Sequence, residues 1–408
     1  PGAGNSTITS ADFTSVTSFT VTETAGVVEF SGNATGNITA SWSGTAGNSI
    51  GSFTRGGITA GTTPDFSGTA TTITLAAGQV FSTNVAELTA IAVTASKTVN
   101  GSGSAVLTDI TADAGDLNAI DTAVAASVDA SNVGTLTGTA ANAATAMTAV
   151  DLTLDLSVNV TLSAGSVTAA DLDTVETNTT QDINMTAVTD VTLSGGESVS
   201  FDSSTVTGET FNLNGAGDNG GESFIVNLAP GGQTVDLSGI TVDSNDVTVT
   251  INGNSGNDNI TGTSSNDVIV TNGGSDTVIF ANSATNNGAD TISDFLSASD
   301  KLDFSAFETA GSTVAASGAL TTTAGTVYYL TGAAAGEADS AAAVATALSA
   351  AATWTDADAT AWVLVSDDNS AAVYEWADSA VSADGVASGE LTLVGTITGT
   401  VAAGDLII

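Results

Sequence analysis

Three consecutive nonapeptides constrain the fold of this chain more than any other feature of its sequence. They run without a gap from Gly253 to Ile279, and each carries Asp at its sixth position and an apolar, strand-favouring residue at its eighth. A short motif that repeats in register indicates stacked copies of one small unit. We therefore expect a parallel β-roll or β-solenoid over this part of the chain. The three aspartates are Asp258, Asp267 and Asp276.

The composition of the nonapeptide explains how it would fold. Its first six residues are mainly Gly, Asn, Ser and Asp and form a tight turn, in which glycine adopts backbone angles that a Cβ would forbid. Its last three residues form a minimal strand with one apolar side chain pointing inward. Two nonapeptides complete one coil, so turns 18 residues apart stack on one side. Asp258 is expected beside Asp276, and Asp267 at the opposite edge.

The charge balance indicates what these turns bind. The chain has 44 acidic and 3 basic side chains, a formal net charge of −41, and no His or Cys. Any metal must therefore be held by oxygen, which favours Ca²⁺ or Mg²⁺. Stacked carboxylates repel one another, whereas Ca²⁺ between turns collects carboxylate and carbonyl oxygens at about 2.3–2.6 Å. We expect calcium at Asp258, Asp267 and Asp276; solvated turns without metal are the alternative.

These repeats resemble the RTX, or haemolysin-type, calcium-binding repeat of Gram-negative proteins exported by type I secretion, with the consensus G-G-x-G-x-D-x-U-x. The segments Asn287–Phe295 and Asp300–Phe304 are similar to the end of the RTX roll in that family. The resemblance implies a right-handed roll, Ca²⁺ as cofactor, and two further ligands, Asp290 and Asp294. The repeat glycines that it places in the metal-binding turns are Gly253, Gly256, Gly262 and Gly274.

The match to the consensus is incomplete. Ser265 replaces the second glycine of the middle repeat, and Thr271–Asn272 replace the first glycine pair of the third. With only three good repeats, we expect a few calcium ions rather than a long array. An upstream patch, Gly215–Glu222, is either a further cation site or a plain loop.

The whole chain is expected to be mainly β, in four segments. Residues 1–107 alternate with a period of two and predict a β-rich N-terminal domain of short strands. Residues 108–190 predict two modules with short helices, because a motif recurs 55 residues later within them. Residues 191–300 are assigned to the β-solenoid and residues 301–408 to a small α+β C-terminal cap.

Local patterns place individual elements. The recurring motif is Asp116–Thr122, which returns as Asp171–Thr177, and each copy is expected to open a short helix capped by its first aspartate. Val344 and Leu348, four residues apart in an Ala-rich run, predict a helix in the cap. Strands are expected at Phe19–Glu23, Val27–Phe30, Ile38–Trp42, Thr72–Leu75, Val191–Leu193, Val199–Phe201, Phe211–Leu213, Phe224–Val226, Val235–Leu237, Val247–Ile251, Trp362–Val365 and Ala372–Trp376, the last two forming a hairpin.

The composition excludes several classes of protein. Three cations cannot neutralise a phosphate backbone, so no nucleic-acid partner is expected. Without His, the chain can form neither an H-E-x-x-H zinc site nor a Ser-His pair, and no pair stands out among its many carboxylates, so we expect no enzyme. The most apolar run, Ala341–Trp354, is shorter than the roughly 18 residues of a membrane span, so no membrane insertion is expected.

Repeats of this type specify export and calcium-dependent folding rather than an activity. The first residues lack a basic and apolar secretory signal, and Asp405–Ile408 resembles the uncleaved C-terminal signal of type I export. The expected location is extracellular, at the bacterial cell surface. In a cytoplasm poor in calcium, self-repulsion would keep such a chain loose and exportable.

Two functions remain open. In the first, a structural protein self-assembles as a homopolymer into an S-layer lattice or an extracellular filament, with calcium driving folding and assembly. In the second, an adhesin or matrix protein binds a cell-surface polysaccharide or another cell through the N-terminal β region. The scarcity of aromatic residues there favours the first, since Trp42 is the only tryptophan of that region and suits a sheet core better than a sugar platform.

Overall fold

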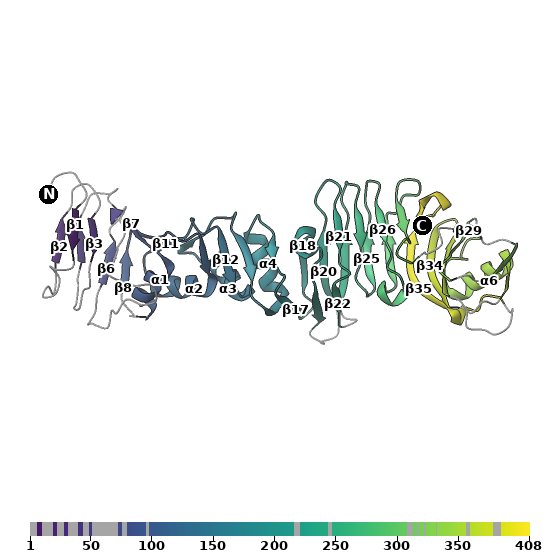
Figure 1. Cartoon of the computed structure of the whole chain (residues 1–408), viewed down its shortest axis with the longest axis horizontal. Helices are drawn as coiled ribbons and strands as arrows, with labels where there is room; N and C mark the ends of the chain where they lie inside the picture. The colour runs from purple at the N-terminus through teal and green to yellow at the C-terminus, as the bar shows by residue number, and fades with distance from the viewer. Residues whose placement is uncertain are drawn as a thin grey trace. The chain divides into compact units, whose positions relative to one another are not determined.

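The computed structural model shows a mainly β protein whose sheets are largely parallel (Figure 1). The chain folds into two compact units, Pro1–Ala187 and Val188–Ile408. None of the helices in the described part of the chain is both long and apolar enough to cross a membrane. The structure describes residues 80–94, 98–215, 221–243, 247–307, 324–331, 333–355, 360–377 and 385–408, together with the strands 6–9, 19–22, 28–31, 40–43, 49–50, 72–75, 313–315 and 318–321.

Parallel strand pairing runs through the first unit, and the four N-terminal strands expected from the sequence are confirmed as β2, β3, β4 and β6. Trp42 lies on β4, and its side chain, expected in a sheet core, lies outside the described part of the structure. The strands of this unit are β1 (Ser6–Thr9), β2 (Phe19–Thr22), β3 (Val28–Ser31), β4 (Ala40–Ser43), β5 (Ser49–Ile50), β6 (Thr72–Leu75), β7 (Val80–Thr83), β8 (Thr98–Gly101), β9 (Ser104–Leu107), β10 (Thr111–Asp113), β11 (Ser127–Asp129), β12 (Thr135–Gly138), β13 (Leu152–Thr153), β14 (Asn159–Leu162), β15 (Gly165–Thr168) and β16 (Ile183–Asn184).

Three helices, α2, α3 and α4, stack beside these strands. The 55-residue repeat runs from α2 to α4, with α3 between them. Thr111, Thr135 and Asn159 lie in register on β10, β12 and β14, so each of these coils takes 24 residues. The motif links the first and third helices, but the second lies between them and packs against both. The helices of the first unit are α1 (Val85–Leu88), which continues into the π-helical turn Thr89–Thr94, α2 (Ala114–Ala123), α3 (Ala140–Thr148) and α4 (Ala169–Asn178).

The helix caps lie three residues before the positions expected from the sequence. Asp113 caps α2 by accepting hydrogen bonds from the N–H groups of Gly115 and Asp116, and the Thr168 hydroxyl accepts from the N–H of Asp171 on α4. Asp116 and Asp171 therefore occupy the first helical turn, where a negative charge favours the positive end of the helix dipole.

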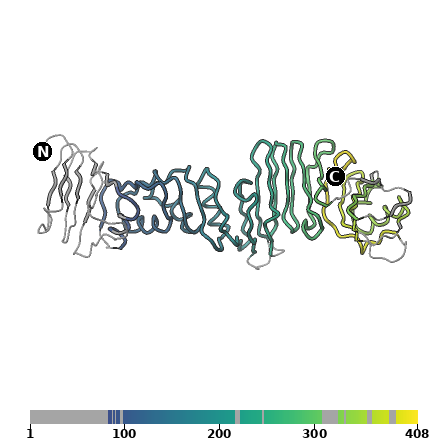
Figure 2. Tube along the Cα trace, in the orientation of Figure 1, coloured from purple at the N-terminus to yellow at the C-terminus, as the bar shows by residue number. Residues whose placement is uncertain are grey.

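The middle strands of the second unit alternate between two sheets in which they pair in parallel (Figure 1), and the backbone turns there lie side by side (Figure 2). From β23 to β28 each strand enters the sheet that the previous strand did not, and Asn259 lies opposite Thr277, the spacing of 18 residues expected for the nonapeptides; the next strand is farther along, with Lys301 opposite Thr277. The strands of this unit are β17 (Val188–Leu193), β18 (Ser198–Asp202), β19 (Phe211–Gly215), β20 (Glu222–Asn227), β21 (Thr234–Asp236), β22 (Ile240–Val242), β23 (Val247–Asn252), β24 (Asn259–Thr261), β25 (Asp267–Val270), β26 (Thr277–Ile279), β27 (Asp290–Ser293), β28 (Lys301–Asp303), β29 (Thr313–Ala315), β30 (Gly318–Thr321), β31 (Val327–Thr331), β32 (Ala352–Thr355), β33 (Thr360–Ser366), β34 (Ser370–Ala377), β35 (Leu391–Thr398) and β36 (Leu406–Ile407).

The chain returns to this stack near its C-terminus. β35 pairs in parallel with β27, and β36 pairs in parallel with β28, so residues about 100 positions downstream form the next coil. The hairpin of β33 and β34 is confirmed as an antiparallel pair, and the expected helix is α6 (Ala341–Ala351), which buries Val344 and Leu348. Sequence patterns alone assigned this region to a cap and did not predict that its strands extend both sheets.

Aromatic packing joins the cap to the stack. Phe280 follows β26 and Phe304 follows the neighbouring strand β28, and their rings stack with centroids 4.9 Å apart. Trp362 on β33 packs edge-on against both rings. Offset stacking and edge-to-face contacts of this kind add to the burial of the rings themselves. The C-terminal strands are therefore held to the coils by side chains as well as by main-chain pairing.

Candidate metal centre

One edge of the coil stack carries a ladder of buried aspartates. Asp258, Asp276 and Asp300 directly precede β24, β26 and β28, and each is no more than 1% exposed. The N–H of Asp258 donates to Oδ1 of Asp276 at 2.8 Å, and the N–H of Asp276 donates to Oδ1 of Asp300 at 3.0 Å. The structure thus places Asp276 beside Asp258, as the 18-residue spacing predicts, and adds Asp300, which the sequence analysis did not select. The shared signal is an aspartate one residue before the strand.

The opposite edge carries a pair of buried aspartates, Asp267 and Asp290. The N–H of Asp267 donates to Oδ1 of Asp290 at 3.0 Å, and both side chains are at least 96% buried. Asp267 also accepts hydrogen bonds from the N–H of Thr263 at 2.6 Å and from its hydroxyl at 2.9 Å. Four of the five aspartates expected as ligands therefore lie in two sets, one on each edge of the stack.

The electrostatics of both sets favour neutralisation of the carboxylates. Burial raises the pKa of Asp276 to about 6, against a hydrogen bond from Asp258 that lowers it, and the charges of Asp300 and Asp258 add to the rise. Burial also raises the pKa values of Asp267 and Asp290, and the charge of Asp267 adds to the rise at Asp290. These carboxylates are therefore costly to ionise without a cation.

The donor set fits a hard cation. The Asp276 side chain is fully buried, so water cannot reach its Oδ2 atom, and this atom has no hydrogen-bond partner. Among the described residues no three acidic side chains come together as a metal-binding group, so an ion here would need main-chain carbonyl oxygens to complete its shell. Ca²⁺ accepts six to eight oxygen ligands of mixed type in flexible geometry. Ions between neighbouring turns would be held by pairs of carboxylates: Asp258 with Asp276 or Asp276 with Asp300 on one edge, and Asp267 with Asp290 on the other.

The repeat glycines allow neighbouring turns to approach. A Cβ on Gly274 would overlap the carbonyl oxygen of Gly256, and a Cβ on Gly256 would lie 2.5 Å from the carbonyl carbon of Gly231. A Cβ on Gly253 would overlap the carbonyl oxygen of Thr271, and one on Gly262 would overlap the Asp267 carboxylate. These glycines permit the spacing at which carbonyl and carboxylate oxygens of adjacent turns come together.

Two other expected positions differ from the ladder. Asp294 follows β27 at the end opposite Asp290, is exposed, and has a left-handed φ of 60°. It shares neither the burial of the other aspartates nor their position at the start of a strand. Of the upstream patch, residues 216–220 lie outside the described residues, whereas Glu222 is 1% exposed.

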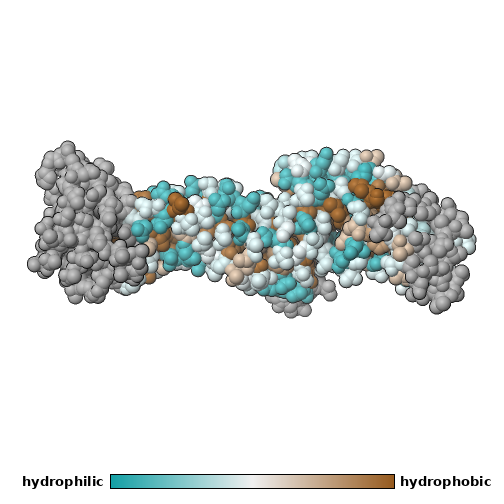
Figure 3. All heavy atoms as spheres, viewed as in Figure 1, coloured by the Kyte–Doolittle hydropathy of each residue, from teal (hydrophilic) through white to brown (hydrophobic). Residues whose placement is uncertain are grey.

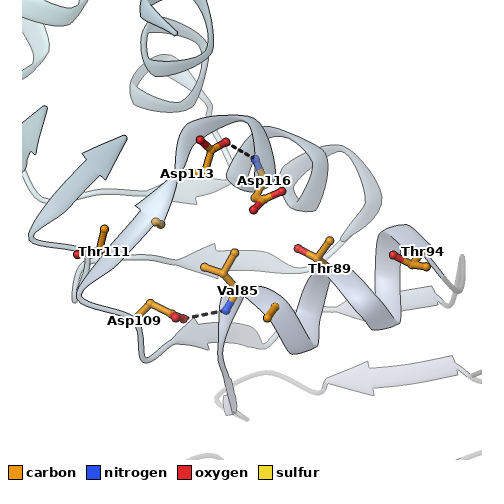
Figure 4. A pocket seen from close by; sticks show the side chains of 9 residues that line it. Val85, Thr89, Thr94, Asp109, Thr111, Asp113 and Asp116 are labelled. Carbon is orange, nitrogen blue, oxygen red and sulfur yellow. Dashed lines mark hydrogen bonds between the residues drawn. The ribbon is translucent and has the colours of Figure 1, made fainter. Parts of the chain in front are cut away.

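A separate hollow lies in the first unit, with a cavity volume of about 410 Å³ (Figure 4). Asp109, Asp113 and Asp116 line it, but Asp109 accepts a hydrogen bond from the N–H of Val85 at 2.7 Å, and Asp113 caps α2. Two of its three carboxylates thus hold helix ends.

Residues 233–337 match the family described as Peptidase M10 serralysin C terminal. This is the RTX-repeat-type region of type I secreted proteins, and the match includes all three nonapeptides and Asp290. No curated protein and no solved structure matches the chain significantly.

Asp276→Asn is expected to abolish calcium binding on its edge of the stack, because the amide loses the negative charge and one carboxylate oxygen. We expect at least a tenfold rise in the calcium concentration at the midpoint of folding, followed by circular dichroism. Asp236→Asn is the control, since the Asp236 carboxylate, at the end of β21, accepts a local hydrogen bond from the N–H of Ser238 and belongs to neither aspartate set. Equal calcium midpoints for the two variants would contradict the site.

Proposed function

We propose that this chain is a secreted, calcium-binding structural protein that self-assembles at the bacterial surface, as an S-layer lattice or an extracellular filament. The observation that carries the proposal is the set of buried aspartates on both edges of the coil stack, with the unpartnered Oδ2 of Asp276 among them. The match to an RTX-type region supports secretion and calcium binding.

Calcium would supply the positive charge that these edges lack. Bound between successive turns, it would offset the repulsion within the Asp258, Asp276 and Asp300 ladder and within the Asp267 and Asp290 pair, and stabilise a right-handed roll. An ion that binds only the folded state stabilises it by mass action. Where calcium is scarce, the same carboxylates favour a loose chain that can be exported.

The surface of the second unit supports assembly through calcium and through one apolar patch. A chain with a net charge of −41 repels its own copies unless cations bridge them. The large apolar side chains that remain exposed among the described residues of this unit are Leu296 (62%), Ile407 (37%) and Ile408 (37%) (Figure 3). Leu296 begins the turn whose Ser297 and Ala298 bond to Asp405, directly before β36, so these residues gather on one coil.

We also propose that these 408 residues carry no catalytic activity. Without His or Cys, a histidine general base, Ser-His and Cys-His nucleophile pairs and His or Cys zinc sites cannot be built from this sequence. Among the described carboxylates, Asp113 caps a helix, and Asp258, Asp276, Asp267 and Asp290 bond to one another's turns, which are structural roles.

Electron microscopy tests the assembly. Millimolar calcium is expected to convert monomers into sheets or fibres, and EGTA to reverse this, because calcium both completes the fold and bridges acidic faces. Magnesium at the same ionic strength is the control for charge screening.

Ile408→Glu separates assembly from folding, since it places a charge on the apolar patch at a residue outside both aspartate sets, whereas the N–H of Leu296 donates to Asp300 of the ladder. It is expected to reduce assembly while the calcium midpoint of folding stays unchanged. A protein that folds with calcium but stays monomeric at every concentration, by light scattering, would contradict self-assembly. Glycan binding by that monomer would favour the adhesin.

A further inference from the structure

Glu222 is a buried carboxylate without a partner. It lies at the start of β20, is 1% exposed, and both of its carboxylate oxygens lack a hydrogen bond. Its side chain points to the same face as Phe224 and Val226, since burial alternates along the strand. On the next strand, β23, the residue opposite it is Val247, which has no polar side-chain atom. An ionised carboxylate in such a place is costly unless a charge compensates it.

A second glutamate lies beside it. Ser198 pairs with Ser223, and the N–H of Ser223 donates to the carbonyl of Glu197, so Glu197 and Glu222 occupy the same position in adjacent coils. Glu197 is half-buried, and its Oε2 accepts a hydrogen bond from the N–H of Ser194 at 3.2 Å. Like charges directly opposite each other on neighbouring strands destabilise a sheet.

The described part of the chain contains no cation that could compensate this pair. Lys301 forms an ion pair with Asp405 at 3.4 Å, and Arg55 and Lys97 belong to the other unit, outside the described residues. What fits two unpartnered oxygens beside a second carboxylate is a bound cation.

We infer that Glu222, with Glu197, holds a hard divalent cation at the start of the coil stack, outside the nonapeptides. Glycines precede both glutamates, with Gly195 and Gly196 at φ of 67° and 73° and Gly221 at 107°, and a Cβ on any of the three would meet no atom within 4 Å. Main-chain carbonyl oxygens of these turns would complete the shell of such an ion. The site lies upstream of the family match, lacks the nonapeptide motif, and does not depend on the proposed function.

The number of ions bound by the full chain tests this site. After equilibrium dialysis against about 1 mM calcium, Glu222→Gln is expected to bind one calcium fewer per chain than the wild type, by atomic emission. Glu337→Gln is the matched control, because it removes the same charge from a turn where Glu337 accepts a hydrogen bond from the N–H of Ala334. It is expected to leave the count unchanged.

Two further variants separate the possible outcomes: Asp276→Asn removes a nonapeptide ligand, and Glu222→Leu replaces the buried carboxylate by an apolar side chain. Asp276→Asn should lose an ion from the nonapeptides, and the double variant with Glu222→Gln should lose both. An unchanged count for Glu222→Gln beside a reduced count for Asp276→Asn overturns this site and leaves the proposed function standing. The site is also overturned if Glu222→Leu raises the thermal midpoint in EGTA and binds as much calcium as the wild type, since Glu222 would then be a buried charge without a ligand.

Discussion

Removing calcium at about pH 8 is expected to unfold the coils formed by residues 247–307, whereas removing it at about pH 5 is expected to leave much of their structure intact. The reason lies in the carboxylates of Asp267, Asp276 and Asp290, whose pKa values are raised above the ordinary 3.8, that of Asp276 to about 6. A proton can replace calcium at these positions below their folded pKa values. Above them it cannot, and the buried charges repel.

The sign of this effect follows from proton binding. Between the unfolded pKa of 3.8 and the raised folded values, the calcium-free folded state holds protons that the unfolded state releases. Its stability is therefore fully present below about pH 4 and is lost as the pH rises through the folded pKa values, by about 1.4 kcal/mol per pH unit for each such proton.

Circular dichroism in EGTA from about pH 4 to 9 measures this loss directly. With saturating calcium the same profile should be flat above about pH 6, and calcium binding should release protons near neutral pH. A calcium-free protein that grows more stable as the pH rises would contradict the assignment of these aspartates.

Gly274→Ala is expected to destabilise the calcium-loaded protein by about 2 to 5 kcal/mol. The new Cβ would overlap the carbonyl oxygen of Gly256 in the next coil, and the φ of 152° at Gly274 favours glycine. Both effects act at the place where two turns meet, so the coils must separate and the Asp258 and Asp276 rungs move apart.

Gly273→Ala is the matched control, one residue away. A Cβ there meets no atom within 4 Å, and Gly273 is exposed. We expect its free energy of unfolding to stay within about 1 kcal/mol of the wild type. Denaturant unfolding in saturating calcium compares the two, and equal stabilities would show that the coils do not approach each other as closely as the structure places them.

The coil geometry of the nonapeptides followed from the sequence because each cause is local. Asp at the sixth position and one apolar residue at the eighth set the turn and the strand within nine residues, so Asn259 opposite Thr277 could be anticipated. The same holds for the hairpin of β33 and β34 and for α6. The 24-residue coils of the first unit were missed because the second helix lacks the motif that marks the first and third.

The sequence by itself determined the chemistry of this protein: oxygen ligands only, an excess of acid, and a period that stacks aspartates on two edges. Tertiary structure alone decided which carboxylates are buried and which of them lie next to one another. Asp300 joins the ladder because β28 follows it and pairs with β26. β35 and β36 continue the two sheets from about 100 residues downstream. Glu222 is buried without a hydrogen-bond partner. Local motifs fix turns and strands over a few residues, whereas burial and pairing depend on which distant segments pack together.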